Sequence, residues 1–186
     1  MNFIHKVPRV YPKTACKNLI RWFEEHMDKA RPGTAGDEKL NDLELFVEII
    51  NHEDYFGLGK TLLKSITNFK NKYSLIDKHI GKWKMYKFVS LMRYTPNNYY
   101  DLIHCENSGM EKYLKRVFAF MIFLNDIKKG GGTKFLFQKF IAKPKAGDFY
   151  IWPAYWTHLH QGINAPKEKK YIITGWVEYI SSVKQI

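Results

Sequence analysis

The stretch VFAFMIFL at residues 117–124, followed by NDIKKGGG at residues 125–132, decides the fold of this chain. An apolar run of this length matches a buried β-strand and falls far short of the roughly 20 apolar residues that cross a bilayer. The glycine-rich segment after it has the composition of a connection between two strands. We therefore predict a buried strand and a turn here, and no membrane span.

Further strand-like runs lie on both sides of this stretch, separated by Gly, Pro and Asn. They are Lys84–Tyr94, Phe135–Ile141, Phe149–Trp152 and Tyr171–Tyr179. Several short strands in series predict a sandwich or jelly roll. Lysines alternate with aromatic residues over residues 82–88, as they do in some nucleic-acid-binding strands. Alternation of period two first of all indicates a strand with one wet face and one buried face.

Two amphipathic helices are predicted before the strands. Apolar residues recur at three- and four-residue steps in Thr14–Lys29 and in Lys60–Asp77. With 186 residues, 45% of them hydrophobic, the chain can form one domain with its own core. We predict a single α+β domain over residues 1–186, in which residues 1–80 are mainly helical support and residues 81–186 form a jelly-roll core. The helices are expected to pack on one face of this core.

The composition bears on partners and compartment. A formal net charge of +12 attracts anionic partners, nucleic acid among them, without choosing between them. Two cysteines, Cys16 and Cys105, are too few for a disulfide framework, and the first residues lack the apolar region of a signal peptide. These features predict a reducing, cytoplasmic setting. We expect a monomer or small homo-oligomer.

Candidate metal ligands are found among the seven histidines. Among them, His52 and His104 are each followed two residues later by a carboxylate. On an extended strand, side chains at positions i and i+2 leave the same face, so an imidazole and a carboxylate can bind one ion. His104 and Glu106 lie in the β-rich half, whereas His52 precedes a predicted helix. We therefore favour His104 and Glu106.

A third ligand would come from WTHLH, residues 156–160, which offers both His158 and His160 after a predicted strand. Two histidines and one carboxylate that leave other coordination positions open are typical of non-haem Fe(II) oxygenases. From the residues alone, either histidine can complete the set.

The C-terminal half carries a series of motifs around these residues. They are RY at 93–94, YDLIHCEN at 100–107, FLND at 123–126, GGT at 131–133, KPKAGD at 143–148, HLHQG at 158–162 and KKYIITGW at 169–176. In this order and spacing, residues 84–180 resemble the catalytic domain of the prolyl 4-hydroxylase-like 2-oxoglutarate/Fe(II) oxygenases. The resemblance implies that the jelly roll is a double-stranded β-helix and that residues 81–186 are the catalytic core.

The resemblance also implies the ligand set. In this family the second histidine precedes the basic anchor of 2-oxoglutarate by ten residues, which is the spacing from His160 to Lys170. The implied iron ligands are therefore His104, Glu106 and His160, with His158 as a neighbour behind them. Lys170 would pair with the distal carboxylate of 2-oxoglutarate.

Three further residues receive roles from the resemblance. Tyr94 would donate a hydrogen bond toward bound 2-oxoglutarate, and Thr174 and Trp176 would face the same site from the strand that follows Lys170. The chain also departs from the family pattern at two positions. Glu106 stands where most of the family has aspartate, which leaves Asp101 as a competing ligand, and Phe123 stands where relatives often carry a tyrosine.

The implied activity is that of a 2-oxoglutarate-dependent dioxygenase, which hydroxylates a C–H bond and decarboxylates 2-oxoglutarate to succinate and CO2. Fe(II), 2-oxoglutarate and O2 would take part, with ascorbate as reductant. The expected substrate is a proline in a peptide or protein, and Trp152, Tyr155 and Trp156 are candidates for an aromatic lip around its ring. The alternative is oxidative demethylation or hydroxylation of a nucleic-acid base. The net charge of +12 suggests it, but the family's nucleic-acid demethylases characteristically use an arginine pair instead of a lysine.

Overall fold

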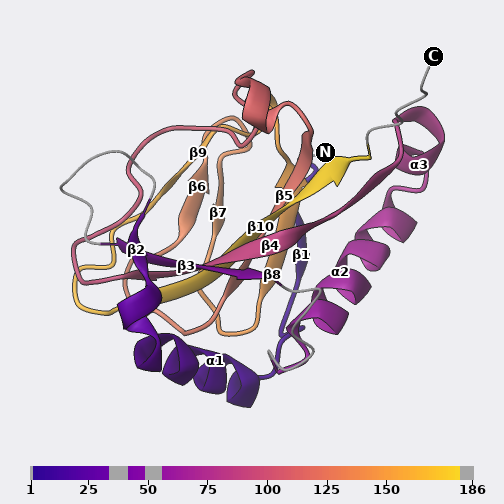
Figure 1. Cartoon of the computed structure of the whole chain (residues 1–186). Helices are drawn as coiled ribbons and strands as arrows, with labels where there is room; N and C mark the ends of the chain where they lie inside the picture. Colours follow the sequence, from indigo (N-terminus) through magenta and orange to yellow (C-terminus); the bar gives the residue numbers. More distant parts are fainter. Residues whose placement is uncertain (1, 34–41, 49–55, 181–186) are drawn as a thin grey trace.

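The computed structural model describes residues 2–33, 42–48 and 56–180, which form helices packed against two sheets (Figure 1). The helices are α1 (Lys13–Glu25), α2 (Leu58–Lys72) and α3 (Ile76–His79), with 3-10 turns η1 (Met27–Lys29), η2 (Glu111–Tyr113) and η3 (Trp156–His158). The strands are β1 (His5–Val7), β2 (Arg31–Pro32), β3 (Asp42–Glu48), β4 (Trp83–Tyr94), β5 (Arg116–Phe123), β6 (Thr133–Phe135), β7 (Phe140–Ala142), β8 (Phe149–Pro153), β9 (His160–Gly162) and β10 (Lys170–Tyr179).

Two antiparallel sheets make up the β-structure. Within the described residues, the larger sheet has seven strands in the order β1-β8-β5-β10-β4-β3-β2, and the smaller has three in the order β7-β6-β9. A buried cluster with members from both sheets lies between them. The predicted α+β fold with a jelly-roll core is confirmed.

Strand β5 lies inside the larger sheet and is covered on both faces. Phe118 and Phe120 belong to the apolar cluster beneath the helices, whereas Ala119 and Met121 belong to the cluster between the sheets. A strand covered on both sides has a continuous apolar sequence. This explains why residues 117–124 show no alternation of apolar and polar side chains.

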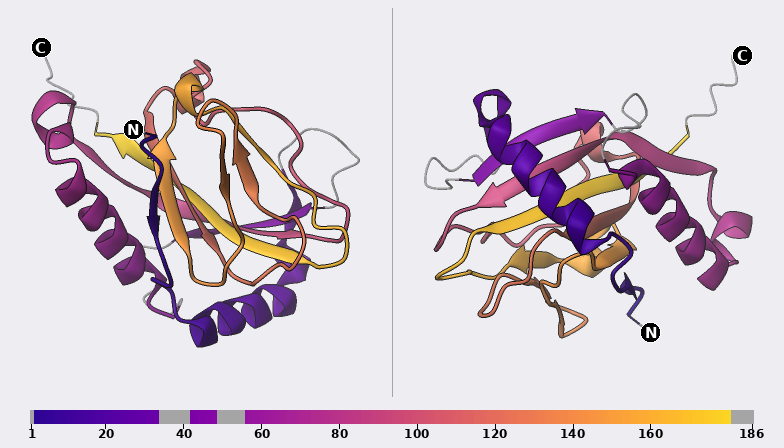
Figure 2. Two further views of the ribbon diagram at one scale, coloured as in Figure 1. Left: turned by 180° about the vertical axis from the view of Figure 1, so that it is seen from behind. Right: turned by 90° about the horizontal axis from the view of Figure 1, so that it is seen from below.

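Helices α1 and α2 pack on the face of the larger sheet that points away from the smaller one (Figure 2). Their buried residues are Cys16, Leu19 and Phe23 in α1 and Leu58, Leu62, Ser65, Ile66 and Phe69 in α2. Each helix therefore has one buried stripe and one wet side. In the part of the chain that the structure describes, every helix is too short or too polar to span a membrane.

Two predicted elements are divided in the structure. The helix predicted over Lys60–Asp77 ends at Lys72, and α3 begins separately at Ile76. The run Phe135–Ile141 is not one strand but a hairpin of β6 and β7, whose turn contains Lys139 with a positive φ of 48°. Apolar side chains continue across both breaks, so periodicity does not reveal them.

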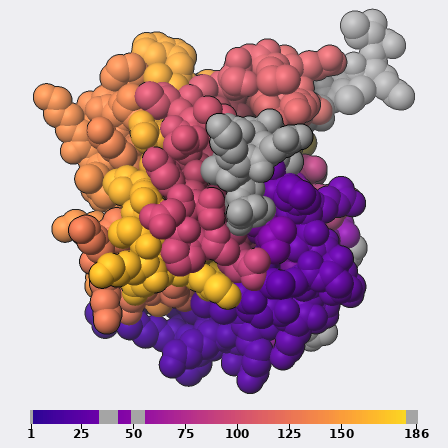
Figure 3. All heavy atoms as spheres, turned by 90° about the vertical axis from the view of Figure 1, so that its left-hand side faces the viewer, coloured from indigo at the N-terminus to yellow at the C-terminus, as the bar shows by residue number. Residues whose placement is uncertain are grey.

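The first 80 residues contribute strands as well as helices. Strands β1, β2 and β3 join the larger sheet, and β3 pairs with β4 from Asp42↔Tyr94 to Glu48↔Phe88. Figure 3 shows one face on which indigo N-terminal atoms adjoin magenta and yellow atoms of later segments. Strands β1 and β2 are too short to show an alternating pattern, which is why the sequence did not predict them.

Gly147, in the turn before β8, packs closely against the N-terminal segment. Its φ is +82°, and an added Cβ would collide with the carbonyl oxygen of Tyr11. A non-glycine residue in the left-handed region costs roughly 1–2 kcal/mol before any clash. Gly147→Ala should therefore lower the free energy of unfolding by more than about 2 kcal/mol in chemical denaturation.

Gly109→Ala is the matched control for this prediction. Gly109 also has a positive φ, of +85°, but beyond its chain neighbours no atom of the described residues lies within 4 Å of the position that an added Cβ would take. Gly109→Ala should lower the free energy of unfolding only by the cost of the left-handed backbone conformation. If Gly147→Ala and Gly109→Ala lower the free energy of unfolding equally, the close approach of Gly147 to Tyr11 does not add to the cost of the substitution.

Candidate active site

The backbone brings two histidines side by side. His160 begins β9, and His104, in the segment between β4 and β5, forms an antiparallel bridge with it. Each backbone N–H donates to the other residue's carbonyl at 3.0 Å. Glu106 turns back toward the pair, so that its Oε1 lies 3.6 Å from Nε2 of His104 and 3.6 Å from Nε2 of His160.

Backbone carbonyl groups orient both imidazole rings. Nδ1 of His104 lies 2.9 Å from the Leu102 oxygen, and Nδ1 of His160 lies 2.9 Å from the His158 oxygen. A ring whose Nδ1–H donates to a carbonyl presents Nε2 as an acceptor or metal ligand. Both Nε2 atoms face Oε1 of Glu106, and in the neutral imidazoles each Nε2 carries the lone pair that a metal ion would accept.

Three electron-pair donors that converge in this way suit a cation. The ligand atoms of His104, Glu106 and His160 lie within 4.8 Å of one another, and this is the metal-ligand cluster found among the described residues. Burial opposes ionisation of Glu106, but hydrogen bonds and charge from the two imidazoles hold the pKa of its carboxyl well below the usual range. Burial lowers the pKa of His104, but the bond to Glu106 gives it a net upward shift. Two imidazoles and one carboxylate fit Fe(II).

The second carboxylate oxygen of Glu106 has its own partners. The indole N–H of Trp176, on β10, donates to Oε2 at 2.7 Å. Nη1 of Arg116 lies 3.5 Å from Oε2 and donates to the backbone carbonyl of Glu106 at 3.3 Å. The guanidinium lies between the rings of Tyr113 and Trp176, at 4.1 and 3.8 Å from their centroids. Arg116 lies outside the sequence motifs that predicted the other site residues.

A buried lysine lies on the neighbouring strands. Lys170 begins β10, is 3% exposed and pairs in register with Tyr94 on β4. Its ammonium is 4.3 Å from the centroid of the Tyr94 ring. The hydroxyls of Tyr94 and Thr174 lie 3.6 and 3.9 Å from the sulfur of Met92. A buried ammonium beside a cavity suits an anionic ligand, because burial strengthens a charge-assisted hydrogen bond.

A cavity of about 820 Å³ between the two sheets connects these groups. The seven residues predicted as site residues all line it: Tyr94, His104, Glu106, His160, Lys170, Thr174 and Trp176. Its volume is that of a small-molecule site. It therefore combines a metal-ligating cluster with a buried cation in one space.

Residues 89–178, which hold these groups, match the sequence model of the 2OG-Fe(II) oxygenase superfamily. Residues 89–178 carry a 2OG-Fe(II) oxygenase domain. The family predicted from the motifs is confirmed, and this oxygenase is a dioxygenase that uses Fe(II), 2-oxoglutarate and O2. Among curated proteins, no match was found.

Solved structures share the fold of this oxygenase over nearly its whole length. A viral collagen prolyl hydroxylase from Paramecium Bursaria Chlorella virus-1, in complex with 2OG, has 19% identity and a TM-score of 0.72 over 96% of this chain and 97% of its own. A Pseudomonas putida prolyl-4-hydroxylase has 12% identity and a TM-score of 0.72 over 97% and 95%. A Trichoplax adhaerens prolyl hydroxylase, bound to a peptide fragment of hypoxia inducible factor, has 12% identity and a TM-score of 0.71 over 96% and 84%.

The other candidate ligands of the oxygenase lie elsewhere. His158 is buried, but it ends η3 and does not extend β9, so its ring does not share the face of His160. Both ring nitrogens of His158 have partners within the chain. Asp101 is exposed and is not part of the ligand cluster. His52 lies outside the described residues.

Of the three candidates for an aromatic lip, Trp152 lines the oxygenase cavity, whereas Tyr155 and Trp156 do not. The ring centroid of Trp152 lies 5.2 Å from that of His160. Tyr155 bonds to Tyr179, and the turn η3 directs Trp156 outward, 68% exposed. Phe123, at the position where relatives carry a tyrosine, is fully buried and does not line the cavity either.

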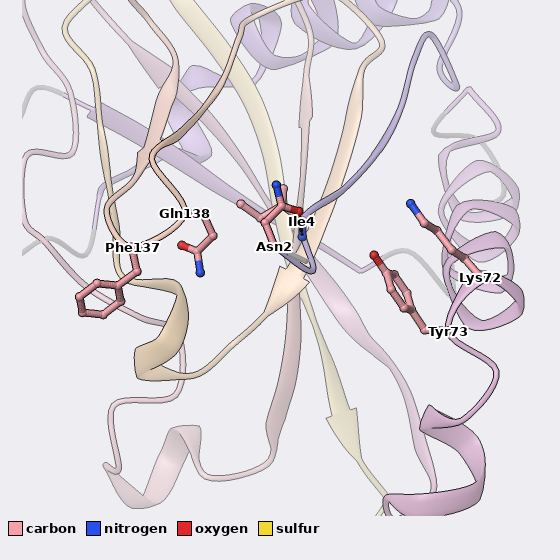
Figure 4. Close-up of a pocket in the computed structure, with 6 residues that line it drawn as sticks. All are labelled: Asn2, Ile4, Lys72, Tyr73, Phe137 and Gln138. Atoms are coloured by element: carbon pink, nitrogen blue, oxygen red, sulfur yellow. Dashed lines mark hydrogen bonds between the residues drawn. The ribbon is translucent and has the colours of Figure 1, made fainter.

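A second cavity, of about 850 Å³, shares no lining residue with the first. Figure 4 shows its side chains, which approach from the N-terminal segment, from α2 and from the turn between β6 and β7. They are Asn2, Ile4, Lys72, Tyr73, Phe137 and Gln138. This set contains no metal-ligating side chain, so the chemistry of the oxygenase belongs to the cavity between the sheets.

Proposed function

We propose that this oxygenase hydroxylates a proline residue in a peptide or protein, with decarboxylation of 2-oxoglutarate to succinate and CO2. The observation that carries the proposal is one cavity that combines three ligand atoms, a buried lysine and an aromatic wall. The solved structures of the same fold, by their names, include a collagen prolyl hydroxylase and a prolyl hydroxylase in complex with a peptide.

The ligand cluster gives the metal end of the cavity its role. His104, Glu106 and His160 would hold Fe(II), with the imidazole rings oriented by backbone carbonyls. The chemistry that a bound Fe(II) supplies is the activation of O2 coupled to oxidative decarboxylation of 2-oxoglutarate, which ends with a hydroxyl group on a substrate carbon. The protein residues fix the positions of the participants and exclude bulk water.

Lys170 would bind the distal carboxylate of 2-oxoglutarate by a charge-assisted hydrogen bond. Its burial favours this, because a carboxylate and an ammonium attract each other more strongly where water is excluded. The hydroxyls of Tyr94 and Thr174 face the thioether sulfur of Met92, which is a weak acceptor. Both would donate more strongly to an oxygen of 2-oxoglutarate.

The aromatic wall beside Glu106 is suited to a proline ring. Tyr86 and Trp176 lie with centroids 6.4 Å apart, and Phe46 and Tyr113 also line the cavity. Aromatic faces pack well against a pyrrolidine ring.

The remaining parts of the proposal rest on the sequence. Ascorbate would act as reductant, and the protein would be cytoplasmic, as a monomer or small homo-oligomer. Nucleic acid is a second candidate partner, because a chain with a net charge of +12 attracts polyanions to its basic surface. Oxidation of a nucleic-acid base is the outcome against which the proposal is tested.

Proline-containing peptides should stimulate 2-oxoglutarate decarboxylation more than methylated single-stranded oligonucleotides do. The cavity wall fits a proline ring, whereas the basic surface provides only nonspecific attraction, so the comparison must be made at near-physiological salt. The measurement is succinate release together with mass spectrometry of the product, which should show one added oxygen atom on proline.

The control peptide carries alanine in place of each proline. It should give only the uncoupled background of 2-oxoglutarate turnover. A demethylated base in the oligonucleotide reactions, with no change in any peptide, would assign the enzyme to the alternative class.

A further inference from the structure

Glu106 lies in a long segment without regular strand structure, between β4 and β5. Its side chain has more rotatable bonds than the two imidazoles and needs external contacts to hold one orientation. The bridge between His104 and His160 fixes their backbones but not the carboxylate. Some other group must therefore hold the Glu106 carboxylate.

We propose that Trp176 is a positioning residue, which binds Oε2 of Glu106 so that Oε1 faces the two histidines. The indole N–H donates to Oε2 at 2.7 Å, the length of a charge-assisted hydrogen bond. Oε1 then stands 3.6 Å from Nε2 of His104 and of His160. This inference rests on the proposed function, because it assigns Trp176 a role toward the metal that the three residues would hold.

Arg116 holds the indole ring in turn. Its guanidinium stacks between Trp176 and Tyr113, with centroid distances of 3.8 and 4.1 Å. The same group lies 3.5 Å from Oε2 and binds the backbone carbonyl of Glu106. The cation thus favours the ionised carboxylate and limits rotation of the ring that contacts it.

The length of the glutamate side chain matters to this arrangement. The carboxylate spans from the indole N–H on one side to the imidazoles on the other. In Glu106→Asp the side chain is shorter by one methylene. Unless the backbone moves, the carboxylate then cannot keep both contacts. Glu106 and Trp176 should therefore act as a coupled pair.

The test is Co(II) binding to the metal-free full-length protein, followed by calorimetry and by the visible absorption of the bound ion. Trp176→Phe keeps a ring for Arg116 to stack on but removes the N–H donor. It should weaken Co(II) binding about 10- to 100-fold, as is usual for loss of a group that supports a ligand. It should also change the Co(II) spectrum.

Trp83→Phe is the matched control, because Nε1 of Trp83 is buried without a hydrogen-bond partner in the described ranges. It should bind Co(II) as the wild type does. In the Glu106→Asp background, Trp176→Phe should have little further effect. An equal effect in both backgrounds would show a general structural role and overturn the inference, as would wild-type affinity in Trp176→Phe.

Indole NMR keeps the inference testable should Trp176→Phe not fold. In the wild type, the Trp176 N–H should exchange slowly with solvent and shift when Zn(II) is added, whereas the exposed Trp156 should do neither. Fast exchange and no shift at Trp176 would contradict the inference.

His160→Ala separates failure of this inference from failure of the proposed function. If His160→Ala loses Co(II) and Trp176→Phe does not, only the role of Trp176 is wrong. If His160→Ala binds Co(II) as well as the wild type, the metal site of the proposed function is wrong as well.

Discussion

Replacing His160 by alanine should abolish turnover and weaken Fe(II) binding by more than about 100-fold, beyond the loss typical of groups that only support a ligand. The substitution removes one of three converging donors and leaves His104 and Glu106 without the second imidazole. The measurements are iron content after anaerobic purification, expected at one Fe(II) per wild-type chain, and succinate production. Treatment of the wild type with a chelator should give the same loss of turnover, reversed by added Fe(II).

His52→Ala is the control for this prediction, since His52 also precedes a carboxylate by two residues. It should keep both iron and activity. His158→Ala tests the other neighbour and should keep the iron, because the His158 ring bonds elsewhere. An inactive His52→Ala enzyme beside an active His160→Ala enzyme would reverse the ligand assignment.

Lys170→Ala should raise the apparent KM for 2-oxoglutarate about 10²- to 10³-fold. Lys170 is 3% exposed, and loss of one partner of a buried charge pair typically costs about 3–5 kcal/mol. Lys170→Arg should do less harm, because it keeps the charge and its planar fork suits a carboxylate. The measurement is the KM for 2-oxoglutarate at saturating substrate peptide.

Lys169→Ala provides the comparison, since Lys169 is the exposed neighbour of Lys170. The KM of Lys169→Ala for 2-oxoglutarate should equal that of the wild type. An unchanged KM in Lys170→Ala would mean that another group binds the distal carboxylate and that the proposed orientation of 2-oxoglutarate in the cavity is wrong.

The sequence was informative where function depends on local spacing. His104 and Glu106 are two residues apart, and the family resemblance assigned Lys170, ten residues after His160, so short motifs predicted which residues would line one cavity. The apolar run of residues 117–124 predicted β5, because a strand buried on both faces needs an apolar residue at every position.

The sequence could not predict contacts that depend on tertiary packing. Trp176 and Arg116 are far apart in sequence yet meet at Glu106, and no periodic pattern records such a meeting. The sequence alone also left open whether His158 or His160 is the third ligand, and the cause is similar. The turn η3 ends at His158, so the two residues do not alternate along one strand as their spacing suggested.

Because a backbone bridge joins His104 and His160, the spacing of these ligands and the choice of substrate can change independently in evolution. The spacing of the two imidazole ligands is set by main-chain hydrogen bonds, which do not depend on side-chain identity. The aromatic wall, in contrast, consists of side chains on other elements, among them Phe46 on β3 and Tyr86 on β4. Substitutions in that wall can therefore alter which substrate is accepted and leave the distance between the two histidines unchanged.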